Sequence, residues 1–587
     1  MRDTLKKERA KRRLFVQPVK ILSYPTLGCL ALLLALCFLL FFWRLGDVPF
    51  YSRGEAREGL VVWEMYTSGD LILPAVNGDY IPFKPPLFHW VGVLTAKILG
   101  RVDEFSVRFP SALFGTLGVL LTFLAGARLW GHKAGMIAAT VLGTSSEWWQ
   151  AATIAQVDMT LAFFTLASLL LFFFLYQKGK SGIGESLGLA VLLGCATLAK
   201  GPLGIALPSL TILVFLCLQR DLAFLKKIHL FASAVLFLLV AGLWYGLAFR
   251  RGGEAFLSRQ ILDENLLTAA GVEGHYQPFY YFIPVLLGNI APWSLFFPSL
   301  ALYLYRRRHH LKEERLRYPL IWFACVLIFF SLSLGKRGVY ILPLYPAAAL
   351  LLGAWWIRLG KREVDFPWFV RPVGYLLAVC YLVIPGSFLA RYLGWNVFDA
   401  ARAFGSSSHQ ESFSLILYSL VPAPAWLSIC LAVSGLAAST LIWTLFKRQW
   451  DWVFVSLGIL TVATALVVKN AYYPYVAGER TLKPFMVRVR QAVDASAPLL
   501  FYRSFDYGAI FYAQRHIASY PENDERLPRP LFLLMWEEEW TQLRPRRDVR
   551  MLDISEGKGP VDRHHLILAE VKDHGAVQSS GPRRNDD

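Results

Sequence analysis

The chain has 587 residues, of which 55% are hydrophobic and 17% are charged. A soluble domain is roughly one quarter charged and roughly 45–50% apolar, so this composition excludes an ordinary soluble enzyme. The mean hydropathy of +0.43 requires long apolar runs, and about 20 apolar residues cross the bilayer core once. The composition therefore predicts a polytopic membrane protein.

The positions of the basic residues and the cysteines give further information about this membrane protein. The net charge of +18 would suggest nucleic-acid binding in a soluble protein. The seven cysteines all lie in apolar runs without disulfide or metal-ligand spacing, which is typical of buried hydrophobic side chains. Residues 2–13 are strongly basic, and the apolar run 27–43 has no small-residue cleavage site after it, which predicts a retained first span.

Thirteen apolar runs are candidate membrane spans. They cover residues 25–43, 110–130, 134–150, 158–177, 185–199, 202–219, 229–249, 279–304, 317–334, 339–357, 371–391, 423–446 and 452–469. Simple alternation of these spans puts the basic loop clusters, such as those at Lys178, Arg220 and Arg306, on one face. Because cytoplasmic loops carry the excess of Lys and Arg, we expect a cytoplasmic N-terminus and no nucleic-acid partner.

This alternation divides the chain into three parts. We expect a basic N-terminus (1–24), a transmembrane domain (25–469) with outer loops 44–109, 250–278 and 392–422, and a periplasmic C-terminal part (470–587). The last part alternates strand-like and helix-like runs, which predicts a small α/β domain with a disordered polar end after His574. The strand-like runs are 499–503, 531–535, 549–554 and 566–571, and the helix-like runs are 482–493 and 537–543.

Charged residues gather at the predicted outer ends of the spans. Glu55, Arg57 and Lys84 lie in the first outer loop, where each is either an interfacial anchor or part of a site. Asp158 stands at the mouth of the fourth span, where a carboxylate is costly unless it is paired or hydrated; a helix N-cap is the simpler alternative. Lys200 ends another span and either caps helix carbonyls or belongs to the site.

Later outer segments add Glu264, His275, Lys336, Arg337 and Tyr340. Carboxylates with several cations at bilayer-surface depth suit chemistry on an amphiphile with a phosphate head, because cations stabilise a departing phosphate and carboxylates hold or deprotonate an acceptor. The sequence has no nucleotide-binding G-x-x-x-x-G-K-[ST] loop and no G-x-G-x-x-G fingerprint. The acids are dispersed, so we expect neither a metal nor another cofactor.

Nine short motifs occur together in the order and spacing of one family. They are Glu55-Ala56-Arg57, Ser68-Gly69-Asp70, Lys84-Pro85-Pro86, Arg108-Phe109-Pro110-Ser111, Asp158-Met159, Ala199-Lys200-Gly201-Pro202, Gly274-His275 with Pro278-Phe279-Tyr280-Tyr281, Pro292-Trp293-Ser294, and Tyr340-Ile341-Leu342-Pro343-Leu344-Tyr345-Pro346. Over residues 45–350 the chain resembles the GT-C glycosyltransferases, in the branch of the bacterial aminoarabinose transferases of lipid A and, more distantly, the dolichyl-phosphate-mannose protein mannosyltransferases.

The resemblance implies an all-α, multispanning GT-C fold in the bacterial inner membrane with its active site on the periplasmic face. It implies a polyprenyl-phosphate sugar donor, an acceptor that is lipid A or another glycan or protein, and a monomeric enzyme. Carried over by motif, Glu55 and Asp158 match the family's acids, and Arg57 its nearby arginine. Lys84 matches the lysine near the lipid phosphate, and Tyr345 the tyrosine of the late motif.

Two positions depart from the family pattern. Gly54 stands where the family usually has its first acid, and Phe83 stands where the aminoarabinose enzymes have a glutamate. One explanation is that Asp158 or Glu55 serves as the base for a hydroxyl acceptor. The other is that the acceptor is a phosphate monoester, which is already anionic and needs only orientation and charge neutralisation.

Two other functions remain open on the sequence. A protein O-mannosyltransferase-like enzyme shares the expected fold. A transporter or flippase of lipid-linked glycans would also carry charges in its membrane domain, but near midspan and with inverted repeats. Here the charges lie at the outer ends of the spans, which favours the enzyme.

Overall fold

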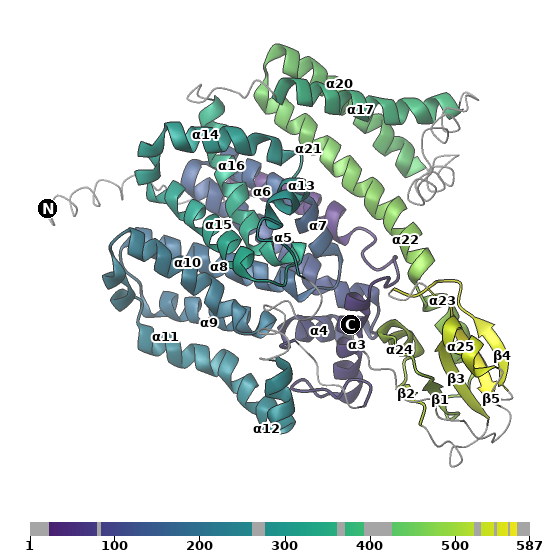
Figure 1. Ribbon diagram of the computed structural model, residues 1–587. Helices are drawn as coiled ribbons and strands as arrows, with labels where there is room; N and C mark the ends of the chain where they lie inside the picture. The colour runs from purple at the N-terminus through teal and green to yellow at the C-terminus, as the bar shows by residue number, and fades with distance from the viewer. Residues whose placement is uncertain are drawn as a thin grey trace.

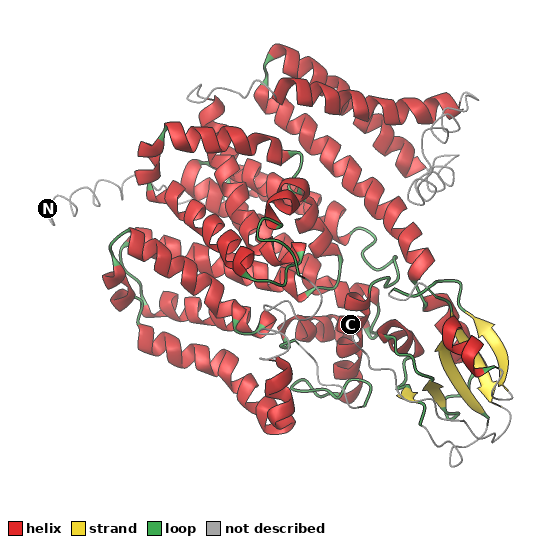
Figure 2. Cartoon of the chain, viewed as in Figure 1, coloured by secondary structure: helices red, strands yellow, loops and turns green. Residues whose placement is uncertain are grey.

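The chain is mostly helical in a computed structural model, and a small sheet forms near its C-terminus (Figures 1 and 2). The structure describes residues 23–78, 84–260, 276–360, 370–392, 425–521, 530–544, 549–560 and 564–571. The basic N-terminus, Glu264, His275, the outer loop 392–422 and the tail after His574 lie outside these ranges or almost entirely so.

Nine helical segments in the described part of the chain are long and apolar enough to cross a membrane. Five of them are single helices: α5 Glu104–Trp130, α8 Val157–Lys178, α9 Ile183–Lys200, α15 Glu314–Leu332 and α20 Ala425–Lys447. Two combine two elements: Tyr24–Phe42 consists of α2 Tyr24–Cys37 and η2 Phe38–Phe42, and Gly338–Leu359 consists of η8 Gly338–Leu344 and most of α16 Tyr345–Gly360. The last two are longer: Leu230–Gln260 includes α11 Leu230–Phe237, η4 Leu238–Gly242 and α12 Leu243–Leu257, and Trp450–Arg480 consists of α21 Trp450–Val467, η9 Val468–Tyr472 and α22 Tyr473–Arg480.

The remaining apolar helices are shorter or bent. A pair that includes α13 Phe282–Asn289, η6 Trp293–Phe296 and α14 Phe297–Arg306 bends by 111° and forms a tenth candidate if it counts as one span. Shorter apolar helices are α4 Leu87–Leu99, α10 Leu203–Leu218 and Val370–Val383 of α17 Val370–Tyr392, while short turns of helix occupy η3 Leu222–Lys227 and η7 Arg308–Lys312. The structure thus confirms a polytopic helical membrane domain, and the count of thirteen spans stays a prediction.

The span predicted at 134–150 differs most from the structure. It consists of two helices, α6 His132–Thr144 and α7 Ser146–Thr153. Ser145 between them has an extended backbone, and its Oγ donates to the carbonyl of Val141 at 2.6 Å. At about 1.5 Å per residue, α6 is roughly 20 Å long, too short to cross a 30 Å core alone. The break turns α7 into a separate short helix.

A surface helix, α3 Arg53–Ser68, follows the first span. Ser52 caps its N-terminus by accepting a hydrogen bond from the backbone N–H of Glu55, and Gly69 ends it in the left-handed conformation with φ of 74°. Its apolar residues Leu60, Val61 and Met65 are buried, in a cluster that includes residues of the C-terminal domain.

The C-terminal part forms a small α/β domain, as predicted, but its sheet has five strands where the sequence indicated four. Its strands are β1 Leu499–Phe501, β2 Ala518–Ser519, β3 Leu531–Trp536, β4 Val549–Ile554 and β5 Leu566–Val571, in the spatial order β2-β1-β3-β5-β4. The β1 pairs with β2 and β3 are parallel and the other two are antiparallel, with Leu533 opposite Ala569. Helices α23 Lys483–Ala492, α24 Tyr507–Ala513 and α25 Glu537–Leu543 complete the domain. The last apolar helix runs on to Arg480, past the predicted boundary at 470.

The C-terminal domain shares one hydrophobic core with α3 and α4. Leu60 and Phe88 of these helices belong to the same buried cluster as Phe485, Ile510 and Leu534 of the C-terminal domain. Polar contacts reinforce this core: Tyr512 donates to Glu104 at 3.0 Å and accepts from the backbone N–H of Phe50 at 2.8 Å. Lys483 also pairs with Glu104 at 2.7 Å. The first outer loop and the C-terminal domain therefore form one folded unit.

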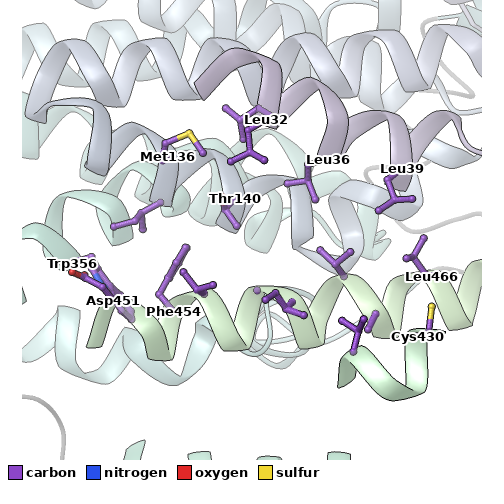
Figure 3. A pocket seen from close by; sticks show the side chains of 18 of the residues that line it. Leu32, Leu36, Leu39, Met136, Thr140, Trp356, Cys430, Asp451, Phe454 and Leu466 are labelled. Atoms are coloured by element: carbon purple, nitrogen blue, oxygen red, sulfur yellow. The ribbon is translucent and has the colours of Figure 1, made fainter. Parts of the chain in front are cut away.

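On another side of the bundle, an apolar groove of about 780 Å³ separates α2 and α6 from α20 and α21. Figure 3 shows Leu32, Leu36 and Met136 on one side of this groove and Phe454 on the other. The ion pair between Lys133 Nζ and Asp451 Oδ2, 2.7 Å apart, contributes the charged groups of its lining.

Candidate active site

Asp158, Lys200 and Tyr340 come together from three different elements. Asp158 lies in the first turn of α8, Lys200 is the last residue of α9, and Tyr340 lies in η8. Lys200 Nζ donates to Asp158 Oδ1 and lies 4.5 Å from the centroid of the Tyr340 ring. The two charged side chains are 15% and 13% exposed, so the pair is sheltered but open to a ligand.

The Lys-Gly-Pro sequence explains how Lys200 reaches this position. Gly201 has φ of 73° and ψ of −154°, a positive-φ conformation that favours glycine, and it ends α9 directly after the lysine. Pro202 then precedes α10, which begins at Leu203. An acidic residue at the start of one helix and a basic residue at the end of another also complement the two helix dipoles. Both helices therefore favour the ion pair.

Glu147 of α7 is a further acid near this group that the sequence analysis did not single out. Its side chain accepts a hydrogen bond from the Asn289 amide, and a Cβ at Gly338 would lie 3.7 Å from its Oε2 atom. Burial, with a smaller contribution from the charge of Asp158, raises the pKa of Glu147 to about 7. An ionisable residue inside a predicted apolar span is the signal that could have marked it.

The predicted catalytic Glu55 lies in a different environment. Arg108 Nε and Nη2 donate to its two carboxylate oxygens at 2.8 and 3.2 Å, and the backbone N–H of Ala155 donates to Oε1 at 3.1 Å. Arg108 also donates to the carbonyls of Leu45 and Val48. This fully buried network engages both oxygens of Glu55 and anchors the loop that leads into Asp158. Both carboxylate oxygens of Glu55 are thus engaged by protein donors, and its catalytic role stays a prediction.

Arg57 and Lys84, the predicted donor-phosphate residues, share the surroundings of Glu58. Arg57 Nη2 lies 2.9 Å from Glu58 Oε1, and His89 Nε2 lies 2.7 Å from Oε2. Although burial favours the neutral acid, Arg57, the His89 contact and the nearby charge of Lys84 lower the pKa of Glu58 to about 2. Glu58 was not among the predicted residues, and it holds the cationic group together.

Lys336, Arg337 and Tyr345, which were also predicted site residues, lie in different environments. Lys336 is buried, and its Nζ donates to the carbonyls of Gln277, at 2.8 Å, and Ser333. Arg337 next to it is exposed. Tyr345 is fully buried at the start of α16. Lys336 therefore closes its own loop, while Arg337 is the cation presented outward there.

This arrangement combines acids of different character with cations at the ends of helices. Asp158 is held by a lysine, whereas Glu147 is partnered by a neutral amide and has a raised pKa. Within the residues that the structure describes, no group of three or more His, Cys, Asp or Glu side chains has metal-binding geometry. Such a set is suited to transfer chemistry in which charge moves between an acceptor and a phosphate.

Comparison with known proteins identifies the fold class of the chain. Residues 83–245 match the family model described as dolichyl-phosphate-mannose-protein mannosyltransferase. ArnT from Cupriavidus metallidurans bound to undecaprenyl phosphate has the same fold, with a TM-score of 0.72 over 95% of this chain and 99% of that one at 21% identity. The fold is therefore that of the GT-C membrane glycosyltransferases.

Two relatives of known sequence extend the comparison. The undecaprenyl phosphate-alpha-4-amino-4-deoxy-L-arabinose arabinosyl transferase 1 of Pseudomonas fluorescens is 30% identical over 52% of this chain and 54% of its own length. An uncharacterized protein of Aquifex aeolicus is 30% identical over 54% of this chain and 70% of its own. The chain thus spans about half to two thirds of the curated relatives it matches. It belongs to the GT-C superfamily of aminoarabinose transferases and protein mannosyltransferases.

Proposed function

We propose that this protein is a membrane glycosyltransferase that moves a sugar from a polyprenyl-phosphate donor to an acceptor at the outer face of the bacterial inner membrane. The observation that carries the proposal is the Asp158–Lys200 pair, which two spans hold at adjoining helix ends. A related protein, ArnT of Cupriavidus metallidurans, is described as bound to undecaprenyl phosphate. That likeness supports the choice of donor.

The proposed roles follow from charge. Arg57 and Lys84 bind the donor phosphate and stabilise the negative charge that it gains when the bond to the sugar breaks. Lys200 holds Asp158 oriented toward the reacting carbon, and Arg337 adds a cation from the neighbouring loop. The acceptor is lipid A or another glycan or protein. Glu55 and Arg108 act through structure, because they fix the loop before α8.

The test is consumption of a radiolabelled polyprenyl-phosphate sugar in proteoliposomes that contain the purified protein. Release of polyprenyl phosphate with transfer of the label to an added glycolipid is the expected result. Movement of the intact lipid-linked sugar across the bilayer, without consumption, would instead identify a flippase.

The proposed orientation has its own test. Alternation of the basic loops supports a cytoplasmic N-terminus and a periplasmic C-terminal domain. A periplasm-dependent reporter fused after Asp587 is expected to be active. A C-terminal reporter active only in the cytoplasm would exclude both this topology and an outward-facing site.

A further inference from the structure

We propose that Glu147 accepts the proton of a hydroxyl group on the acceptor, so that the acceptor nucleophile is a hydroxyl rather than a phosphate monoester. This inference rests on the proposed transferase function and specifies its acceptor chemistry. Glu147 lies outside the motifs by which the chain resembles its family. The argument therefore depends on the position and environment of this side chain.

The backbone around Glu147 is fixed on both sides. Ser146 Oγ donates to the carbonyl of Asn289 at 3.0 Å. Trp148 is fully buried and donates through Nε1 to the carbonyl of Gly115 at 3.2 Å. Its ring packs so closely on Gly118 that a Cβ there would lie 2.5 Å from it. The carboxylate between these anchors is therefore held in one place, as a positioned proton acceptor must be.

The groups that face Glu147 come from five other elements. Asn289 of α13 donates to it, and Gly338 of η8 lies beside Oε2. Asp158 of α8, Tyr345 of α16 and Tyr473 of α22 are close enough to interact with its charge. Because the hydrogen-bond donor is a neutral amide and the nearest charge is a carboxylate, the surroundings favour a basic carboxylate at this position.

The two acids at the site therefore differ in their partners. Asp158 accepts from the Lys200 ammonium, whereas Glu147 accepts from the neutral amide of Asn289. Burial, together with Asp158, raises the pKa of Glu147 to about 7, near the optimum for a general base at neutral pH. Glu147 thus supplies the site with a basic carboxylate.

The step balances in atoms and charge. The acceptor O–H bond breaks and its proton binds a carboxylate oxygen of Glu147, while the acceptor oxygen forms a bond to the anomeric carbon. The bond from that carbon to the phosphate oxygen breaks, and its electron pair leaves with the polyprenyl phosphate. The proton then passes from Glu147 to water. A phosphate monoester acceptor has no such proton to lose at neutral pH, so it does not need this base.

The experiment compares wild type with Glu147→Gln, which keeps size and hydrogen bonding but removes basicity. The control is Glu185→Gln at the opposite end of α9 from Lys200. Each purified protein is assayed in proteoliposomes with a polyprenyl-phosphate sugar and either a hydroxyl-bearing glycolipid or its phosphate monoester, at a series of pH values on both sides of 7. Thermal unfolding and donor affinity are measured on the same preparations.

Wild type and Glu185→Gln are expected to glycosylate the hydroxyl acceptor, with activity rising as pH increases through about 7. Glu147→Gln is expected to lose about 10²- to 10⁴-fold in kcat. It should also lose the rising limb of the pH–activity profile, while its donor affinity stays unchanged. Asn289→Ala removes a hydrogen bond to the charged form, so it should move the limb to higher pH even if Glu147→Gln does not fold.

Three results would overturn the inference. One is a folded Glu147→Gln variant with wild-type kcat and pH profile; another is an unmoved limb in Asn289→Ala. The third is wild-type preference for the phosphate monoester. A wild-type protein that consumes no donor with either acceptor would contradict the proposed function itself, so the two failures are distinguishable.

Discussion

Arg108 and Glu55 form a bidentate ion pair beneath the first outer loop, with side chains only 3% and 1% exposed. The pair joins α5 to α3, and the Arg108 contacts to the Leu45 and Val48 carbonyls extend it to the end of the first span. Removing one partner of a buried pair leaves an uncompensated charge, which is more costly than losing a surface bridge.

We therefore expect Arg108→Met to destabilise the protein strongly, by about 3–5 kcal/mol in the free energy of unfolding. Arg101→Met is the matched control, because its side chain is 76% exposed in a surface pair with Asp103. Thermal unfolding in detergent, followed by tryptophan fluorescence, measures both. Equal unfolding temperatures for the two variants would show that the pair contributes little to stability.

Asp158→Asn is expected to reduce turnover by at least about 10²-fold, because it keeps size and hydrogen bonding but removes the charge that Lys200 holds. The unfolding temperature and the yield of protein should change little. Asp451→Asn, in an exposed pair on α21, is the control. Near-normal turnover in Asp158→Asn together with loss in a folded Glu55→Gln would reverse the roles that the geometry supports.

Lys84→Ala is expected to weaken binding of the donor by roughly 10- to 100-fold, the equivalent of one charged hydrogen bond. Folding should be preserved because the buried Glu58 retains Arg57 and His89. Affinity for polyprenyl phosphate, measured by displacement of a labelled lipid, tests this, with Lys178→Ala as the control. Unchanged affinity in a folded Lys84→Ala variant would return this lysine to the role of an interfacial anchor.

The buried contact between Glu58 of α3 and His89 of α4 predicts how the stability of the protein depends on pH. The pKa of Glu58 is about 2 in the folded protein, against about 4.3 in an unfolded chain. A lowered pKa gives stability that is fully present above about pH 4.3 and is lost as the pH falls through about 2. Wild type should therefore exceed Glu58→Gln in unfolding temperature at neutral pH, and the difference should shrink below about pH 4. The matched control is Glu479→Gln, which replaces an exposed glutamate.

Hydropathy and motif spacing were sufficient for a polytopic helical domain with a small C-terminal sheet domain, and they drew attention to Asp158 and Lys200, which the structure brings into contact. Each of these depends on local patterns that a sequence displays directly. The pairing of Glu55 with Arg108, 53 positions further along, is a tertiary contact that no periodicity encodes. The sequence accordingly could not distinguish a catalytic carboxylate from one that is fully engaged by a guanidinium.

Glu147 was missed for a related reason. Averaging hydropathy over 134–150 concealed a single carboxylate, and the same averaging concealed the break at Ser145 that makes α7 a separate helix. Only the folded chain brings Asn289 and Gly338, more than a hundred residues later, next to that carboxylate. A rule that treats every ionisable residue in an apolar run as a candidate would have marked it.

The core shared by α3, α4 and the C-terminal domain has a consequence for biogenesis. The partner helix α23 begins about 400 residues after α3 ends, so at about 5–20 residues per second the ribosome delivers it roughly 20–80 seconds later. During that interval the nascent first loop presents the apolar side chains of Leu60, Met65 and Phe88 without their final cover. Membrane insertion of the first span therefore precedes completion of this shared core, and a chain whose synthesis stops before Lys483 would leave these apolar side chains uncovered.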